Sequence, residues 1–165
     1  MKLNIITGDS PDFDILRQVA AEVPTPGYKQ WVPALVQDMR DTMAMSGGVG
    51  LAAPQVGLGW RIIVAGTRAL ANPRITSYGQ SKAALEEGCL SLPGLSRVVL
   101  RPTSIVVEAL DIDEDRHVII ATRGTLARII QHEVDHLNGV LITDRNLWSW
   151  EESPLPFGIK RRKQP

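Results

Sequence analysis

The stretch TLARIIQHEVDHLN, residues 125–138, decides the fold of this chain. Its apolar residues recur at helical spacing, at positions 126, 129, 130, 134 and 137, and Gly139 follows directly. This pattern predicts an amphipathic helix over residues 125–138 that ends at the glycine. His132 and His136 are four residues apart in it, so their imidazoles lie one above the other and can bind one ion.

Glu133 completes an HExxH pattern with these two histidines. It lies about 100° around the helix from His132, beside a bound ion but not on it. Zinc proteases use this arrangement as two metal ligands and a general base. The alternative is a pair of histidines on an exposed helix face with a solvated glutamate, since short motifs also occur by chance.

The chain before this helix predicts one other helix and several short strands. Apolar spacing predicts a helix over residues 29–45, which ends at Ser46-Gly47-Gly48. Residues 49–57 are small and apolar with a proline, and we expect them to be extended. Strands are expected at residues 61–65, 97–100, 104–110 and 117–122. A loop is expected around Asn72-Pro73, and a polar stretch precedes Glu86. Residues 111–116 are expected to form an acidic, solvated hairpin tip. This order favours an α+β fold with mostly antiparallel sheets.

Composition excludes several classes of protein. The chain has 165 residues, the size of one domain, with 44% hydrophobic and 22% charged residues. Its 18 basic and 18 acidic residues cancel, so no whole-molecule field attracts DNA or a membrane surface. No segment resembles a signal peptide or a membrane span. We therefore expect a soluble, cytoplasmic protein.

Few side chains are available as metal ligands besides carboxylates. There is one cysteine, Cys89, and there are three histidines. A single cysteine cannot form a disulfide within the chain, which leaves a buried apolar residue, a nucleophile or a metal ligand. His117 falls in an expected strand, where a surface or packing role is the ordinary one. An ion bound to His132 and His136 needs a third ligand, and these observations leave Cys89 and the carboxylates as the candidates.

Three segments together resemble the signature of the peptide deformylase family. They are GVGLAAPQ at residues 48–55, EGCLS at 87–91 and QHEVDHL at 131–137, and they occur in the family's order. The resemblance covers about residues 5–145 and implies antiparallel sheets packed around a central, metal-binding HExxH helix. We expect residues 1–147 to form a single catalytic domain. Residues 148–165 would be a C-terminal tail without the long helix of many bacterial members, because Pro154 and Pro156 would break it.

The resemblance also implies a metal site. Cys89, His132 and His136 would bind one divalent ion and leave its fourth position for water, as a catalytic site requires. The family points to Fe(2+) in the cell, and the mixed thiolate and imidazole set could also hold Zn(2+), Ni(2+) or Co(2+) in a purified sample.

The implied activity is hydrolysis of the formyl group from the N-terminal formylmethionine of newly made polypeptides. Metal-bound water, deprotonated by Glu133, attacks the formyl carbon, and Glu133 passes the proton to the leaving amine. The family's oxyanion donors correspond to the Gln55 side-chain amide and the Leu90 backbone N–H. Val49, Gly50 and Leu90 are the candidates for contact with the substrate backbone and methionine side chain. The glycines of this segment can alternatively be plain turn residues.

Two other functions are compatible with part of the pattern. A peptidase or another metal amidase of the HExxH type would be expected to provide a further histidine or glutamate after the helix, and no histidine follows His136. A structural metal module would not need Glu133 or Gln55. The basic end at residues 160–163 could contact ribosomal RNA, although a short basic tail is more often only solubilising.

Overall fold

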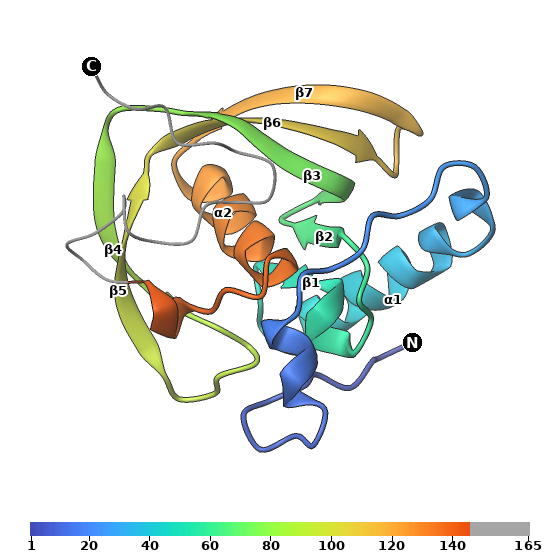
Figure 1. The fold of residues 1–165 in the computed structure, drawn as a ribbon, viewed down its shortest axis with the longest axis horizontal. Helices are drawn as coiled ribbons and strands as arrows, with labels where there is room; N and C mark the ends of the chain where they lie inside the picture. The colour runs from blue at the N-terminus through green and yellow to red at the C-terminus, as the bar shows by residue number, and fades with distance from the viewer. Residues whose placement is uncertain (146–165) are drawn as a thin grey trace.

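The computed structural model describes residues 1–145 and has an α+β architecture, which confirms the expected fold class (Figure 1). Its two α-helices are α1 (Val32–Met45) and α2 (Thr125–Leu137). The strands are β1 (Gly50–Ala52), β2 (Ile62–Ala65), β3 (Arg68–Tyr78), β4 (Lys82–Gly88), β5 (Ser96–Pro102), β6 (Ser104–Asp111) and β7 (Arg116–Arg123). Short 3-10 helices are η1 (Phe13–Arg17), η2 (Tyr28–Gln30), η3 (Ala53–Val56) and η4 (Ile142–Asp144).

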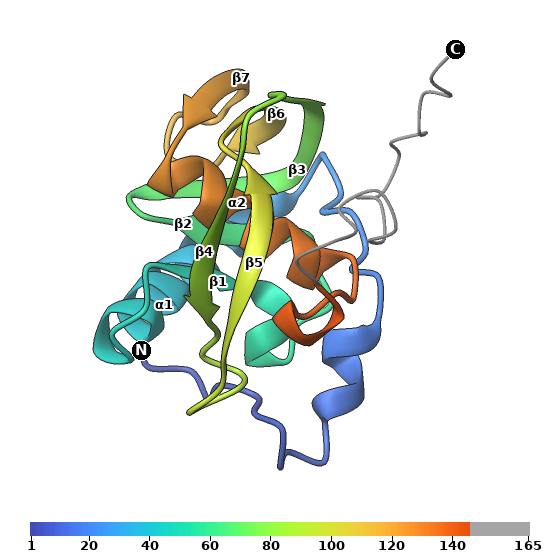
Figure 2. The same ribbon diagram turned by 90° about the vertical axis from the view of Figure 1, so that its left-hand side faces the viewer.

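The strands of residues 1–145 form two separate antiparallel sheets. Five strands pair in the order β1-β2-β3-β6-β7, and β4 pairs only with β5. The β4–β5 hairpin is therefore an insertion between β3 and β6, which are neighbours in the large sheet. Figure 2 shows this hairpin as two long strands that run beside α2.

The large sheet separates the two helices in the region of β2. Ile63 faces the core that α2 forms with Ile130 and Val134. Ile62 and Val64 belong instead to the core built on α1. All four β2 residues are buried, because successive side chains of a strand point to opposite faces and both faces are covered here.

Several boundaries differ from the predicted ones for identifiable reasons. The first helix begins at Val32, because Pro33 occupies its first turn and residues 28–30 form a 3-10 helix. Only residues 50–52 of the segment 49–57 form a strand, and η3 follows from Ala53, with Pro54 in its first turn. The loop expected at Asn72-Pro73 is wrong: both residues lie inside β3, at a register shift where Asn72 has φ of 52°. Strand β4 was not predicted.

The acidic turn is a hairpin tip between β6 and β7, as predicted, but it is docked as well as solvated. Asp113, an exposed residue, forms an ion pair with Arg40 of α1 and accepts a 2.9 Å hydrogen bond from it. Asp111 is buried, and its Oδ2 lies 3.0 Å from Arg68 Nη1. The tip thus connects the sheet to α1.

Neither α-helix of residues 1–145 is long and apolar enough to cross a membrane. The predicted tail, residues 148–165, and its basic end lie outside the described residues.

Candidate metal centre

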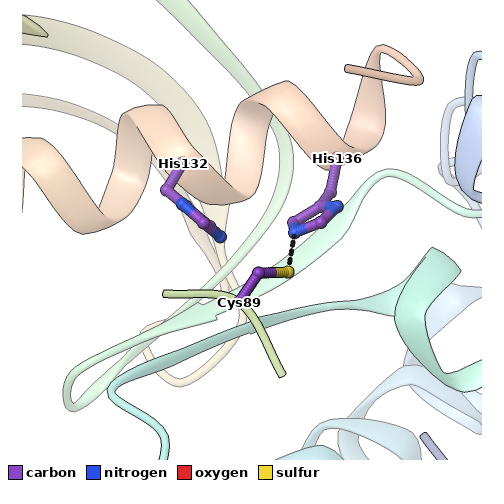
Figure 3. Close-up of side chains that lie close together, drawn as sticks. All are labelled: Cys89, His132 and His136. Atoms are coloured by element: carbon purple, nitrogen blue, oxygen red, sulfur yellow. Dashed lines mark hydrogen bonds between the residues drawn. The ribbon is translucent and has the colours of Figure 1, made fainter. Parts of the chain in front are cut away.

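The three candidate ligands converge from two elements that are distant in the sequence. Cys89 follows the last residue of β4, and His132 and His136 lie on one face of α2 (Figure 3). Their donor atoms all lie within 4.8 Å of one another. Figure 3 shows both imidazoles directed from the helix toward Cys89, whose Sγ lies 3.2 Å from His136 Nε2.

The spacing and chemistry of these donors fit a divalent metal ion. Tetrahedral bonds of about 2.3 Å to sulfur and about 2.0 Å to nitrogen place two such donors roughly 3.5 Å apart. The observed 3.2 Å between Cys89 and His136 is close to this value. A thiolate with two imidazoles suits zinc, iron, nickel or cobalt, and three protein ligands are typical of a catalytic site.

Glu87 orients the first histidine. Its Oε2 lies 3.0 Å from His132 Nδ1, which leaves Nε2 of the ring for the site. Burial alone would raise the pKa of Glu87, but hydrogen bonds from Arg101 and His132 hold it well below its usual range. Burial likewise opposes protonation of His132, yet the hydrogen bonds with Cys89 and Glu87 raise its pKa to about 10 in the metal-free protein. Burial lowers the pKa of His136.

A buried ionic cluster surrounds this contact. Arg101, only 1% exposed, donates to Glu87 from Nε at 2.6 Å and from Nη2 at 2.8 Å. Its Nη1 donates to Asp135 of α2 at 2.8 Å, and Asp135 also pairs with Arg145. Since one unpaired charge in such a place is strongly destabilising, the members of the cluster depend on one another.

Glu133 lies beside the three candidate ligands and is buried. It is 4% exposed, and burial raises the pKa of its carboxyl to about 7. Its Oε2 has no hydrogen-bond partner among residues 1–145. The carboxylate fits because residue 50 is glycine: a Cβ there would lie 2.3 Å from Glu133 Oε1.

The Gln55 amide is held in one orientation. Its Oε1 accepts a 2.9 Å hydrogen bond from the Ala52 backbone N–H, so Nε2 is directed the other way. There it lies 3.2 Å from the buried Ser91 Oγ and 3.6 Å from Cys89 Sγ. Leu90, the residue between these two, is half-buried.

One cavity of about 570 Å³ joins most of the predicted residues. Its lining includes Val49, Gly50, Gln55, Cys89, Leu90, His132 and Glu133. Val49 is 63% exposed at this place, whereas Gly50 is buried. His117 lies elsewhere, exposed on β7. The sequence did not indicate the roles of Glu87, Arg101, Asp135 or Ser91, although Glu87 and Ser91 lie within a recognised motif.

Comparisons with known proteins identify the family to which the chain is related. The family model described as polypeptide deformylase matches residues 2–149. A peptide deformylase of Picosynechococcus is 41% identical over 140 residues, 79% of this chain and 73% of that protein. Peptide deformylase 1 of Clostridium perfringens is 47% identical over 142 residues, 82% of this chain and 94% of that protein.

Solved structures share the fold. A crystal structure of peptide deformylase from Ehrlichia chaffeensis has a TM-score of 0.81 at 35% identity, covering 90% of this chain and 89% of that one. A Met-Ala-Ser-bound class I type b peptide deformylase from Acinetobacter baumannii has a TM-score of 0.81 at 32% identity, covering 88% and 99%. The chain therefore belongs to the polypeptide deformylase family of enzymes.

Proposed function

We propose that the chain is a metal-dependent hydrolase that removes the formyl group from the N-terminal formylmethionine of newly made polypeptides. The observation that carries this proposal is the convergence of Cys89, His132 and His136 within 4.8 Å, in the same cavity as Glu133. A relative bound to Met-Ala-Ser supports the substrate class, because a peptide beginning with methionine is what deformylation would leave.

Cys89, directly after β4, would hold the metal together with His132 and His136 of α2. We propose Fe(2+) in the cell, with Zn(2+), Ni(2+) or Co(2+) as substitutes in a purified sample. When bound, the ion supplies a Lewis acid that polarises the formyl oxygen and makes water more acidic. Glu87 keeps His132 in the tautomer that presents Nε2.

Glu133 moves the proton in the proposed reaction. Its carboxylate takes a proton from the attacking water and gives it to the amine that leaves. A pKa of about 7 supports both steps, because a group that titrates near neutral pH can accept and return a proton.

Gln55 and Leu90 would stabilise the negative charge that develops on the formyl oxygen. The Ala52 N–H fixes Gln55 Oε1 and so leaves Nε2 ready to donate. The Leu90 backbone N–H, next to Cys89, is the second proposed donor. Such fixed donors do not have to reorient during the reaction, and removal of one typically costs about 10²–10³ in rate.

The peptide would bind along β1, which is an edge strand of the five-stranded sheet. An extended peptide can add to such an edge through main-chain hydrogen bonds. Val49, Gly50 and Leu90 are the proposed contacts, and the cavity also has Leu92, Leu95 and Ile129 in its lining, where an apolar methionine side chain fits.

Further proposals concern the chain as a whole. We propose one catalytic domain over residues 1–147, acting in the cytoplasm on the nascent chain. The family model, which matches residues 2–149, supports the extent of this domain. Contact with the ribosome through residues 160–163 remains a proposal about residues outside those described.

Turnover of formyl-Met-Ala-Ser tests the proposed function. Ferrous enzyme prepared without oxygen is expected to release formate, and Glu133→Gln to lower kcat by about 10²–10⁴ while the metal content stays the same. Cys89→Ala is expected to lose both metal and activity, and His117→Gln, outside the site, to retain both. No turnover by the wild type, or equal turnover by Glu133→Gln, would overturn the assignment.

A further inference from the structure

The hairpin that carries Cys89 is attached to the rest of the fold mainly at its far end. Among residues 1–145, β4–β5 shares no backbone ladder with the large sheet. At this far end a 2.8 Å hydrogen bond from Thr103 N to Ser81 O closes the hairpin, and Gly124 N, just before α2, donates to Thr103 O at 2.8 Å and so joins this end to the rest of the fold. Cys89 lies at the opposite end, so the distance from its thiol to α2 depends on side-chain contacts.

Arg128 makes three such contacts from one guanidinium. Its Nη1 donates to Glu87 Oε1 at 2.6 Å and to the Val99 carbonyl at 3.0 Å, and its Nη2 donates to the Ala83 carbonyl at 2.6 Å. The acceptors belong to both strands of the hairpin, while Arg128 belongs to α2. The side chain is 14% exposed, and these bonds are therefore largely shielded from water.

Arg128 also lies one helical turn before His132, on the same face of α2. The two residues contact the same carboxylate, since Glu87 Oε1 accepts from Arg128 and Glu87 Oε2 lies against His132 Nδ1. Glu87 is two residues before Cys89 in the chain. One carboxylate thus connects the strand end that carries the thiol with the helix face that carries both imidazoles.

We infer that Arg128 is a positioning residue, which holds the β4–β5 hairpin against α2 and so sets the distance between the Cys89 thiol and the two histidines. This inference rests on the metal site proposed above. Arginine suits the task because its planar group presents several donors in a fixed fork, whereas a lysine ammonium is a compact point charge. Although Arg128 lines the cavity, its engaged donors make it a part of the frame and not a group that binds substrate.

Cobalt(II) alone is the probe that tests this role. The near-ultraviolet band of a cobalt–thiolate bond reports the Cys89 contact, and competition with a chelator gives the affinity. Arg128→Leu is expected to weaken cobalt binding by about 10–100-fold and to reduce the band, as loss of an outer contact of a metal site typically does. Arg128→Lys is expected to lie between this variant and the wild type. Arg123→Leu, an exposed arginine at the end of β7, is expected to match the wild type.

The other outcomes distinguish failure of the inference about Arg128 from failure of the proposed metal site. If cobalt affinity and band are unchanged in Arg128→Leu, or if only KM for formyl-Met-Ala-Ser rises at saturating metal, Arg128 acts on substrate or not at all, and the inference is wrong. If Arg128→Leu does not fold, Arg128→Lys decides, and wild-type cobalt binding in that variant overturns the inference. If the wild type itself gives no thiolate band, or Cys89→Ala binds cobalt equally well, the proposed metal site is wrong, and the inference falls with it.

Discussion

Replacement of Gly50 by alanine tests whether the carboxylate of Glu133 is held where the proposed proton transfer needs it. The backbone of residue 50 is ordinary strand, and an added methyl group meets no conformational obstacle there. It meets a packing obstacle instead. The new Cβ would lie 2.3 Å from Glu133 Oε1 and 2.8 Å from Ile129 Cγ2, and ordinary contact begins near 3.4 Å.

The magnitude follows from these distances. To restore ordinary contact, the Glu133 oxygen must retreat by about 1 Å, and a misplacement of that size can lower a rate by about 10²-fold. This fold-change corresponds to about 2.7 kcal/mol of transition-state stabilisation. Overpacking of a full core destabilises by about 1–3 kcal/mol, and the lower chain entropy of alanine offsets roughly 0.5–1 kcal/mol of it. We expect a folded enzyme with a large loss of kcat.

The assay is steady-state release of formate from formyl-Met-Ala-Ser, together with urea unfolding and metal content. The metal content of Gly50→Ala should equal that of the wild type, because no proposed ligand is displaced. Gly59→Ala is the matched control, since no atom lies within 4 Å of its added Cβ. In a Glu133→Gln background, Gly50→Ala should lower kcat no further. A wild-type kcat in Gly50→Ala, or an undiminished effect in the double variant, would refute the reasoning.

Two other expectations concern stability, both measured by urea unfolding. Arg101→Leu leaves the buried carboxylates of Glu87 and Asp135 with fewer partners and should lower the free energy of unfolding by about 3–5 kcal/mol. Arg74→Leu removes an exposed ion pair and should lower it by about 0–1 kcal/mol. Equal losses in the two variants would contradict this expectation. In the metal-free protein, burial raises the pKa of Glu133 from 4.5 to about 7, so its stabilising contribution is complete below pH 4.5 and is lost as the pH rises to 7. Relative to Glu133→Gln, the wild type should therefore lose roughly 3 kcal/mol between pH 4.5 and 8, and a flat difference would mean that this carboxyl titrates normally.

Local patterns predicted the elements whose residues act together over short distances in the chain. The helix over residues 125–138 was predicted because its apolar spacing and its two histidines repeat within four turns, and the structure has it at Thr125–Leu137. The convergence of Cys89 on these histidines was accessible only through the resemblance, since no local pattern relates residue 89 to residue 132.

The missed features have long-range causes. The sequence of β4, KAALEEG, has no clear alternation of apolar and polar residues, and its one buried side chain is a charged one, Glu87, which meets Arg101 of the next strand. Arg101 in turn is buried between Glu87 and Asp135, which approaches it from α2. Asn72-Pro73 looks like a loop by composition, but a bulge accommodates it within β3. The partners Glu87 and Arg101 are 14 residues apart and Arg101 and Asp135 are 34 apart, so they leave no periodic signal.

The two edges of the large sheet differ in what they offer to other chains. Among the residues described, the edge strands of this sheet are β1, with three residues, and β7, with eight. Long open edges invite pairing between molecules, which charged side chains discourage. β7 begins at Arg116 and ends at Arg123, but between them Ile119 is 72% exposed. The nascent chains that we propose as substrates are unfolded and present unpaired strands, and resistance to aggregation with them would depend on the two arginines at the ends of β7.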